Sequence, residues 1–597
     1  MGRDHHHLEA DVVVVGGGLA GVCASLAAAR NGATVVLVHD RPVLGGNTSS
    51  EICVHAGGAD HDGSRPHARE SGIIEELRLE DAVKDPRCVP VMWDLILYDA
   101  VRRERGITLL LNTSCWAANM ATRHRIGSIT AIRPSTHDTF VIEGRLFIDS
   151  TGDGWLGYFA GADFRQGREA PEEYNEPHAQ GPDSKTMGAS LMFLARDIGE
   201  PVEFQPPPWA RKFLTCDALP HRHPTLTPHG FWWNELGGLF DMTKDTERVR
   251  DELVATLLGL WDHIKNHCPE CSDKARTWEL TWFGWVPGKR ETRRLVGDHV
   301  LTENDLVDAV LFPDRVAHGG WPIDLHPPRG LYDPEPPAAF VPLADIYSIP
   351  LRALYSRNIE NLLFAGRCIS ATHVAMGSTR LAATGAAMGQ AVGTAAAMCA
   401  AKSITPRELA DRHIDELQEK LLRQDQYIPD LAAGDPDDLA RRASIAASSA
   451  AEDSPPENVT NGVTRHRRGA TNQWASAPDQ VLPQWLELRW PQPQEISLLE
   501  FTFDTGFARP LTHTQYPHSR AKQVRGPQPE TVKDARIEAW LDGGWRHVAT
   551  IRGNYRRKVV LELLSPVRTD RLRLIVEATN GEPQARVYEV RAYATSR

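Results

Sequence analysis

Two short apolar runs near the N-terminus, and a stretch of small residues between them, define the first elements of the chain. Residues 12–15 are four consecutive valines, and residues 34–38 (TVVLV) form a second run. Short β-branched runs of this kind are typical of strands that are buried on both faces. Residues 19–31 are rich in alanine and end before Gly32, as expected for a helix with a C-terminal glycine. The pattern predicts a βαβ unit.

The sequence GGGLAG follows the first predicted strand directly and has the spacing G-x-G-x-x-G. In such a motif Gly16 makes the tight turn, Gly18 lets the backbone approach a pyrophosphate, and Gly21 lets helix and strand pack closely. The helix begins at Leu19 and Ala20, where free N–H groups and the positive end of the dipole face the phosphates. Because a strand precedes the motif and a helix follows it, we predict a dinucleotide-binding site.

The end of the second predicted strand is where a carboxylate normally accepts hydrogen bonds from ribose hydroxyls. His39 occupies this position, and Asp40 follows it directly. Either the His39 imidazole binds the ribose or Asp40 substitutes for it, and the sequence leaves both alternatives open.

The chain continues with alternating helical and extended patterns. Residues 164–343 are rich in Trp, Pro and His and are expected to form an interposed region. A later helix of small residues, over residues 378–401, can lie close to a sheet or a cofactor. The pattern predicts helices over residues 72–83, 93–104, 246–266 and 378–401, and strands over residues 107–111, 145–149 and 361–366.

Beyond residue 456 the pattern changes to short alternating strands separated by turns. Examples are residues 485–490, 536–540 and 572–576. This spacing predicts a β-sandwich. Residues 435–456 are rich in Ala, Ser, Asp and Pro and are expected to be a linker that holds a short helix.

Composition and charge narrow the functional classes. The chain has 597 residues, more than one core usually holds, and its 41% hydrophobic and 24% charged residues are those of an ordinary globular protein. A net charge of −12 argues against a general nucleic-acid binder. No apolar run reaches the length of a transmembrane helix. Nine cysteines, an odd number in a large chain, indicate reduced thiols and a cytoplasmic location.

Four sequence blocks, in this order, carry a family resemblance. They are DRPVLGGNTSSEI (residues 40–52), FIDSTGDG (147–154), GKRETRRLVGDHVLTENDL (288–306) and NLLFAGRCISATHVAMGSTRLAATGAAMGQAVG (361–393). With them the chain resembles the FAD-dependent oxidoreductases of the glutathione-reductase-like flavoprotein superfamily, over roughly residues 10–430. The tail, with ENVTNGVTR (457–465) and PQWLELRW (483–490), is similar to galactose-binding-like, discoidin-type sandwiches.

The resemblance implies an α/β fold in which a Rossmann-like FAD-binding domain carries an interposed α+β substrate region and is followed by an all-β sandwich. We therefore expect the FAD-binding domain at residues 1–160 and 344–435, the substrate region at 161–343, the linker at 436–455 and the galactose-binding-like sandwich at 456–597.

The resemblance also implies FAD, bound covalently or non-covalently, with its adenosine end on the βαβ unit. Gly45, Gly46 and Asn47 would line the flavin side, and a turn at Asp149 would make a second contact. The residues implied to bind FAD beyond the βαβ unit are Arg41, Gly45, Gly46, Asn47, Ser50, Asp149, Gly152, Asp153, Gly366, Arg367 and Gly377.

His373 and Arg290 are the candidate catalytic residues. An alcohol or amine that gives hydride to flavin must also lose a proton to a base, and histidine suits this role. His373 lies between the last flavin-contacting glycine and the long predicted helix, so it acts either as this base or only as a hydrogen-bond partner of flavin or backbone. Arg290 is expected to orient an anionic or polyhydroxylated substrate or to stabilise reduced flavin, whereas Arg293 and Arg294 are expected to form internal ion pairs.

A short run of histidines and cysteines could hold a metal. His263, His267, Cys268 and Cys271 have a spacing that zinc ligands can show. One C-x-x-C without a distant second pair is a weak signal, so we expect incidental thiols at a helix end and no metal.

A loop rich in proline and glycine contains four candidate substrate-binding residues. They are His318, Trp321, Asp324 and His326. Because Trp faces commonly stack on sugar rings, this loop is either a substrate wall or a packed structural loop.

These patterns predict an FAD-dependent dehydrogenase or oxidase that takes hydride from a CH–OH group of a sugar, glycoside or similar polyol. The alternatives are C–C or C–N dehydrogenation of a natural product or organic acid, and a carbohydrate-binding flavoprotein scaffold without turnover. We expect a small-molecule substrate, an electron acceptor that the sequence does not identify, and neither nucleic acid nor membrane as a partner. A homo-oligomer is compatible with the sequence.

Overall fold

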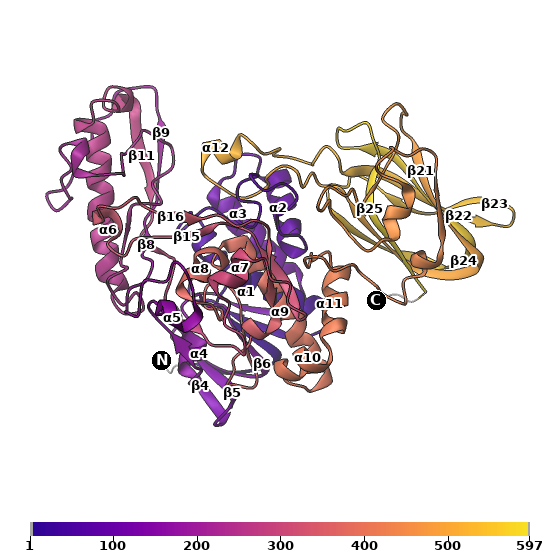
Figure 1. Cartoon of the computed structure of the whole chain (residues 1–597), viewed down its shortest axis with the longest axis horizontal. Coiled ribbons are helices and arrows are strands. Elements are labelled where there is room, and N and C mark those ends of the chain that lie inside the picture. Colours follow the sequence, from indigo (N-terminus) through magenta and orange to yellow (C-terminus); the bar gives the residue numbers. More distant parts are fainter. Residues whose placement is uncertain (1–3, 595–597) are drawn as a thin grey trace. The chain divides into compact units, whose positions relative to one another are not determined.

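The computed structural model describes residues 4–594 and divides the chain into two compact units (Figure 1). The chain passes between the units more than once. The first unit comprises residues 1–61, 88–417 and 512–521, and the second comprises residues 62–87, 418–511 and 522–597. A short segment of the C-terminal part, residues 512–521, thus belongs to the first unit, and residues 62–87 belong to the second.

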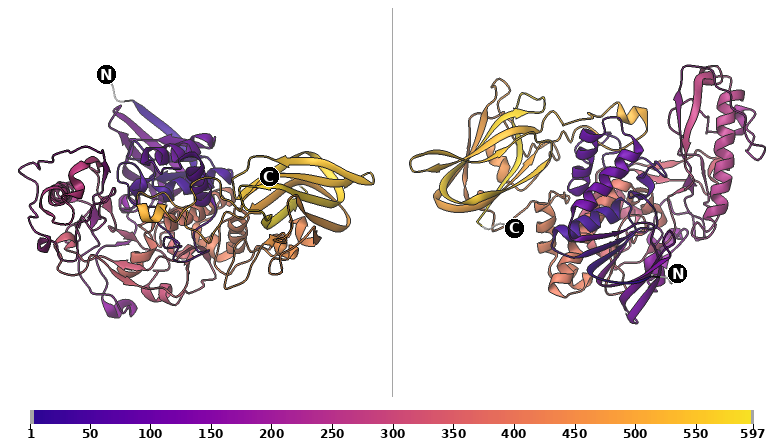
Figure 2. Two further views of the ribbon diagram at one scale, coloured as in Figure 1. Left: turned by 90° about the horizontal axis from the view of Figure 1, so that it is seen from above. Right: turned by 180° about the vertical axis from the view of Figure 1, so that it is seen from behind.

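The first unit is built on a seven-stranded sheet in the order β3-β2-β1-β6-β5-β4, with β18 also paired to β6 (Figure 2). The pairs between β1, β2, β3, β6 and β18 are parallel, whereas β4 and β5 add an antiparallel edge. The strands are β1 (His5–Val15), β2 (Val35–Val38), β3 (Ile107–Leu110), β4 (Ser114–Thr122), β5 (Arg125–Arg133), β6 (Asp138–Asp149) and β18 (Leu362–Phe364).

The predicted βαβ unit is present, because β1 pairs in parallel with β2 and α1 (Leu19–Arg30) connects them. The strand predicted over residues 145–149 is the end of the longer β6. The stretch before it forms β4 and β5, which extend the sheet beside β6 as consecutive antiparallel strands.

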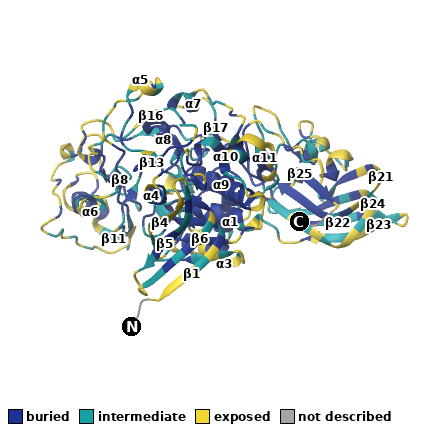
Figure 3. Cartoon of the chain, turned by 90° about the horizontal axis from the view of Figure 1, so that it is seen from below, coloured by how far each residue is buried: buried dark blue, intermediate teal, exposed yellow. Residues whose placement is uncertain are grey.

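Helix α1 packs against α9 (Ala382–Lys402), and both are almost fully buried (Figure 3). Glycines of α9 make this contact possible, because a Cβ on Gly389 would lie 2.1 Å from the carbonyl oxygen of Ala20. The helix predicted over residues 378–401 is present as α9, which begins at Ala382. Residues 378–379 belong instead to the short helix α8 (His373–Thr379), and Leu381 between the two helices is extended.

The interposed region contains a second core in the first unit. Helix α6 (Thr246–Asp262) continues into one π-helical turn (His263–His267) and agrees with the predicted helix. Its apolar side packs in one cluster with β9 (Phe193–Asp197), and β9 pairs antiparallel with β11 (Trp278–Phe283).

Short elements complete the first unit. The helices are α3 (Pro90–Arg103), α4 (Trp155–Phe159), α5 (Pro171–Tyr174), α7 (Glu303–Val307), α10 (Pro406–Arg412) and α12 (Pro517–Arg520), and α11 (Ile414–Arg423) follows α10. The strands are β7 (Phe164–Arg165), β8 (Ala189–Ser190), β10 (Glu235–Leu236), β12 (Gly288–Lys289), β13 (Arg294–Leu295), β14 (Arg315–Gly319), β15 (Ile323–Leu325), β16 (Ala339–Val341) and β17 (Tyr347–Pro350).

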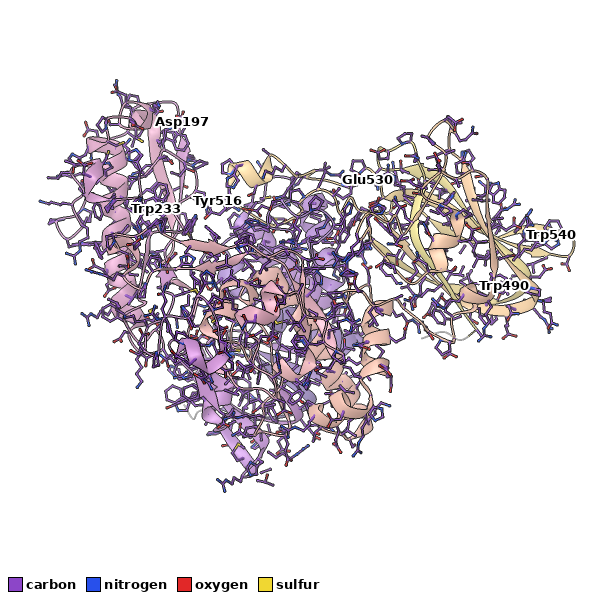
Figure 4. The ribbon with its side chains drawn as sticks, in the orientation of Figure 1. Asp197, Trp233, Trp490, Tyr516, Glu530 and Trp540 are labelled. Atoms are coloured by element: carbon purple, nitrogen blue, oxygen red, sulfur yellow. The ribbon has the colours of Figure 1, made fainter. Side chains whose placement is uncertain are left out.

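The second unit is an antiparallel β structure with the order β20-β25-β21-β24-β22-β23, consistent with a β-sandwich. The predicted strands lie inside β21, β22 and β24, and the labelled Trp490 and Trp540 lie on β21 and β22 (Figure 4). Residues 444–447, in the stretch expected to be a linker, form β19 and pair with β21. Helix α2 (Ile73–Lys84) also belongs to this unit. The strands are β19 (Ser444–Ala447), β20 (Trp474–Ala475), β21 (Gln484–Phe503), β22 (Val532–Leu541), β23 (Gly544–Ile551), β24 (Lys558–Thr579) and β25 (Arg586–Tyr593).

Within residues 4–594, none of the helices combines the length and the apolar character that crossing a bilayer requires.

Candidate active site

The glycine turn between β1 and α1 has the geometry that a pyrophosphate site needs. Gly16 adopts a φ of +104°, and a Cβ on Gly21 would lie 1.8 Å from the Gly16 carbonyl oxygen, so neither position accepts a side chain. Gly18 differs, because a Cβ there would meet only Gly46 Cα, at 3.9 Å. Gly18 is the N-cap of α1, and no described side chain caps the first turn at Leu19. The backbone at the start of α1 is therefore open to an anionic ligand.

His39 is fully engaged in holding this turn. The Gly17 N–H donates to His39 Nδ1 at 3.0 Å, so Nε2 carries the proton and donates to the Val43 carbonyl oxygen at 3.0 Å. Burial lowers the pKa of His39, which keeps the ring neutral. The side chain of Asp40, by contrast, is 61% exposed. The imidazole has no free nitrogen for a ribose hydroxyl, whereas the Asp40 carboxylate is accessible.

Asp153 is the centre of a buried cluster of charges. Its carboxylate accepts from Lys289 Nζ at 2.6 Å, from Arg367 Nη2 at 3.1 Å and from the Thr292 hydroxyl at 3.1 Å. Burial alone would raise the pKa of Asp153, but the charges of Lys289 and Arg367 outweigh it and lower the pKa. Asn47 donates to the Lys289 carbonyl oxygen at 3.0 Å, which ties the Gly45–Asn47 loop to the same cluster.

Asp149 and Gly152 shape the turn that carries Asp153. Asp149 accepts from the backbone N–H groups of Thr151, at 3.0 Å, and Gly157, at 2.9 Å, and burial raises its pKa. A Cβ on Gly152 would lie 2.6 Å from Arg367 Nη2. These residues thus position Arg367.

Buried polar atoms without a partner lie in the segments around this turn. The hydroxyl oxygens of Ser49 and Ser150 and Nη1 of Arg367 have no hydrogen-bond partner among the described residues. Buried polar groups in proteins are almost always hydrogen-bonded, so these atoms indicate a missing partner. Together with the open start of α1, they fit a group rich in phosphate and hydroxyl oxygens such as FAD.

The other predicted FAD-binding residues fall into two groups. Gly45, Gly46 and Gly366 have φ values of +108°, +58° and +89°. A Cβ on Gly366 would lie 3.3 Å from Ala20 Cβ, and one on Gly46 would lie 3.1 Å from Gly18 Cα, so these two loops lie against the start of α1. Three others have protein partners. Arg41 is paired with Glu51 at 3.4 Å, the Ser50 N–H donates to Asp94 at 2.9 Å, and Gly377 packs against the Asp324 backbone nitrogen, which a Cβ would approach to 3.0 Å.

His373, the first residue of α8, is held by two buried glutamates. Its Nδ1 lies 2.8 Å from Glu291 Oε2, and its backbone N–H donates to Glu169 at 2.9 Å. Arg294 lies between the two carboxylates, with an ion pair to Glu291 and another to Glu169 at 2.6 Å. Burial would raise the pKa of Glu291, but His373 and Arg294 outweigh it and lower the pKa. Glu291 is therefore ionised and fixes the ring, and Arg294 forms the predicted internal ion pairs.

No described residue bonds to Nε2 of His373. An imidazole that donates through Nδ1 to a carboxylate presents Nε2 as a proton acceptor, as in the catalytic triads of hydrolases. The arrangement can therefore remove a proton from a bound substrate.

Arg290 belongs to a second buried network. Its Nη1 lies 3.3 Å from Glu235, and Glu235 is 2.6 Å from Nδ1 of His326. His326 Nε2 is 3.1 Å from Asp324, which also pairs with Arg380 at 2.9 Å. Arg380 directly follows α8, so this network and the His373 network are joined through that helix. Asp324 and His326 thus serve as supports for Arg290 and α8, whereas the sequence suggested a substrate wall as one alternative.

Trp321 is part of an aromatic group that includes a residue from the C-terminal part of the chain. Its ring is 4.5 Å from His61 and 6.3 Å from His55, and its buried indole nitrogen has no hydrogen-bond partner among the described residues. Tyr516 lies 5.9 Å from His55 and 4.4 Å from His229, next to α12 in the first unit (Figure 4). The carbonyl oxygen of Trp321 accepts from Ser378 of α8, the helix that begins with His373.

Sequence reasoning did not identify Glu235, Arg380 or Tyr516. Glu235 and Tyr516 lie outside the four blocks, and no local pattern links them to the site. Arg380 lies inside the last block, in GSTRL, where an arginine in an otherwise apolar helical stretch was the available signal. His318 is buried on β14.

The four residues considered as metal ligands do not all come together in the structure. His267 pairs with Asp262 at 3.2 Å, whereas His263 lies 3.5 Å from the thiol of Cys216. Cys268 and Cys271 are buried in the core around α6.

Comparisons with known proteins found structural neighbours for only part of the chain. No curated protein is significantly similar to the chain. The family 32 carbohydrate-binding module of Clostridium perfringens NanJ, in complex with galactose, matches 26% of this chain and 95% of its own, at 15% identity and a TM-score of 0.19. The family 32 module of Streptococcus pneumoniae EndoD matches 26% and 99%, at 18% identity and a TM-score of 0.21. These TM-scores support no conclusion about a ligand.

The family model described as FAD dependent oxidoreductase matches residues 11–421, which is most of the chain. The match includes the glycine turn, the Asp153 cluster and His373. The protein is FAD-dependent, and the chain belongs to the FAD-dependent oxidoreductase family.

Proposed function

We propose that the protein oxidises a CH–OH group of a sugar, glycoside or similar polyol, with His373 as the base. The observation that carries this proposal is the 2.8 Å contact between His373 Nδ1 and the buried carboxylate of Glu291, which leaves Nε2 as a proton acceptor. Bound FAD supplies the oxidising chemistry by accepting hydride from the substrate carbon.

In the proposed reaction, Nε2 of His373 takes the hydroxyl proton as the carbon–oxygen double bond forms. The electron pair of the C–H bond leaves as hydride, so the substrate loses two electrons and two hydrogens in total. Glu291 stabilises the imidazolium that results, because it stays ionised beside the ring. Glu169 and Arg294 keep the dyad in place.

For the substrate, we propose that Arg290 and the aromatic group orient a polyhydroxylated molecule. Arg290 is held by Glu235 and is only 8% exposed, so its guanidinium is fixed in direction. Trp321 supplies a half-buried aromatic ring and an indole N–H without a protein partner. Sugars offer both apolar faces and hydroxyl acceptors, and aromatic rings with one polar atom suit them.

For the cofactor, we propose that the FAD phosphates bind at Leu19 and Ala20, that Asp40 binds the adenosine ribose, and that Arg367 and the Gly45–Asn47 loop bind the flavin half. The open backbone at Gly18 and the unpartnered atoms of Ser49, Ser150 and Arg367 support this arrangement. We also propose that the chain belongs to the glutathione-reductase-like superfamily.

A panel of metabolites tested without oxygen separates the alternatives. Loss of oxidised flavin absorbance is followed after adding sugars and polyols, amines, or organic acids, with dithionite as the control for full reduction. Reduction by polyols, with the matching ketone or aldehyde as product, supports the proposal. Reduction by amines or by saturated organic acids alone overturns the CH–OH assignment. Full dithionite reduction without reduction by any polyol also counts against it.

A further inference from the structure

Three cysteines and two histidines gather beside the end of α6, away from the FAD-binding residues. Cys216, His223 and Cys268 each offer one ligand atom, and these atoms all lie within 4.8 Å of one another. In a tetrahedral zinc site, ligand atoms lie about 3.5–3.8 Å apart. The three atoms are therefore close enough to bind one ion after small side-chain movements.

Cys271, the second cysteine of the C-x-x-C turn, lies beside Cys268 but is not among the three residues whose ligand atoms all lie within 4.8 Å of one another. Its side chain would turn toward the other three to become the fourth ligand. The Cys268 thiol neighbours both Cys216 and Cys271. The Cys271 thiol also lies 3.6 Å from the carbonyl oxygen of Pro224, the residue after His223. The loop that carries His223 and the C-x-x-C turn thus face each other.

The local fold explains why these residues converge. The π-helical turn His263–His267 ends with the Cys268 N–H donating to the His263 carbonyl oxygen at 2.7 Å, which turns Cys268 and Cys271 into the core. Cys268 is fully buried and Cys271 is 5% exposed. Cys216 comes from the 3-10 turn Cys216–Ala218.

His263 supports the cluster from the other side. Its Nδ1 donates to the Phe213 carbonyl oxygen at 2.6 Å, so Nε2 is unprotonated and accepts from the Cys216 thiol at 3.5 Å. Zinc takes cysteine ligands as thiolates, so binding of the ion would release the protons of the cysteine thiols.

We propose that Cys216, His223, Cys268 and Cys271 bind one structural zinc ion. Three thiolates and one imidazole form a closed set with no open position for substrate, so the ion has a structural role. It would fix the loop of residues 216–223 to the end of α6. The sequence led us to expect no metal, because one C-x-x-C stood alone. The fold supplies the missing distant ligands from an earlier segment.

The test is the metal content of the purified full-length protein, followed by cobalt substitution. About one zinc per chain is expected, and Co²⁺ added after zinc removal should give the intense visible bands of tetrahedral cobalt–thiolate sites, at wavelengths beyond the absorption of oxidised flavin. Cys268→Ser and Cys216→Ser should each lose these bands, and His223→Cys should keep them. Cys115→Ser, which changes a half-buried cysteine on β4, is the matched control and should behave as the wild type.

Three outcomes overturn the proposal. The first is less than about a tenth of a zinc per chain together with no cobalt band. The second is unchanged metal content in Cys268→Ser. A Cys268–Cys271 disulfide in the freshly purified protein, detected by thiol counting, would also contradict it. FAD content, read from the flavin absorbance of each variant, shows whether a variant that loses metal still keeps the folded cofactor site.

Discussion

His373 Nδ1 and Glu291 Oε2 lie 2.8 Å apart, although the two residues are separated by 82 positions in the chain. Glu291 is fully buried and paired with Arg294, so it cannot turn toward solvent. The contact gives His373 one defined orientation and one available nitrogen.

The role of Glu291 is tested by Glu291→Gln. The amide keeps the size of the side chain but removes the charge that stabilises the imidazolium, so the rate of flavin reduction by substrate should fall by on the order of 10²-fold or more. Glu143→Gln, an exposed site on β6, is the control. An unchanged reduction rate, with normal FAD content, would mean that Glu291 does not assist the base.

The Glu291→Gln variant also tests how the free energy of unfolding depends on pH. Because the folded chain lowers the pKa of Glu291 below its ordinary value of 4.5, the ionised group stabilises the fold above that pH, and this contribution is lost as the pH falls through the folded-state pKa. The difference in free energy of unfolding between wild type and Glu291→Gln should be constant from neutral pH to about pH 5 and shrink in more acidic solution. Urea midpoints at several pH values measure it. A difference that grows on acidification would contradict the direction of the shift.

Gly18→Val tests the pyrophosphate position. Gly18 has ordinary extended dihedral angles and open space around its Cα, so the apoprotein should fold with near-normal stability. The new side chain would fill the approach to the start of α1, and the purified variant should contain little or no FAD. Gly544→Val is the control, because a Cβ on Gly544 would have nothing within 4 Å and Gly544 lies in the second unit. Normal FAD content in Gly18→Val would show that the site is misplaced.

Variants of Asp40 and His39 should show which of the two residues binds FAD and which one stabilises the fold. Asp40→Asn removes an exposed carboxylate, so it should raise the Kd for FAD about tenfold and leave the melting temperature of the apoprotein unchanged. His39→Ala removes the acceptor of the buried Gly17 N–H and should lower that melting temperature. FAD titration and thermal unfolding of both apoproteins provide the comparison. The opposite pattern would assign the ribose to the imidazole.

Tyr516 should affect substrate binding more than chemistry. Tyr516→Ala removes a ring that contacts His55 and His229, so KM should rise with FAD content unchanged. Tyr98→Ala, an exposed tyrosine on α3, is the matched control. An unchanged KM would remove Tyr516 from the substrate site. Deleting residues 456–597 would test the role of Tyr516 less cleanly, because it also removes the rest of residues 512–521 from the first unit.

Local features of this chain were predictable from the sequence, and long-range ones were not. The turn at Gly16, the close packing at Gly21 and the βαβ unit depend on neighbouring residues, and the family match confirms the FAD-dependent enzyme. The function of His39 depends on Val43 and Gly17, which is visible only once the loop is folded. The break between α8 and α9 depends on Leu381 in a stretch of strong helix formers.

The features that the sequence did not predict depend on contacts between residues far apart in the chain. No periodicity brings Glu291 to His373, or Cys216 to Cys268, because the segments between them form whole elements of the interposed region. The pattern of strands and turns also could not predict that residues 512–521 belong to the first unit and residues 62–87 to the second. Three inferences stay predictions: the domain boundaries, the catalytic roles and the cytoplasmic location.

The central claim, that His373 is the base, is tested most directly by flavin reduction in His373→Ala. The variant is mixed without oxygen with the substrate found in the metabolite panel, and the absorbance of the flavin is followed by stopped flow. We expect normal FAD content, a reduction rate lower by about 10²–10⁴-fold, and loss of the pH dependence that a titrating imidazole produces. A reduction rate equal to that of the wild type, with full FAD content, would contradict the assignment.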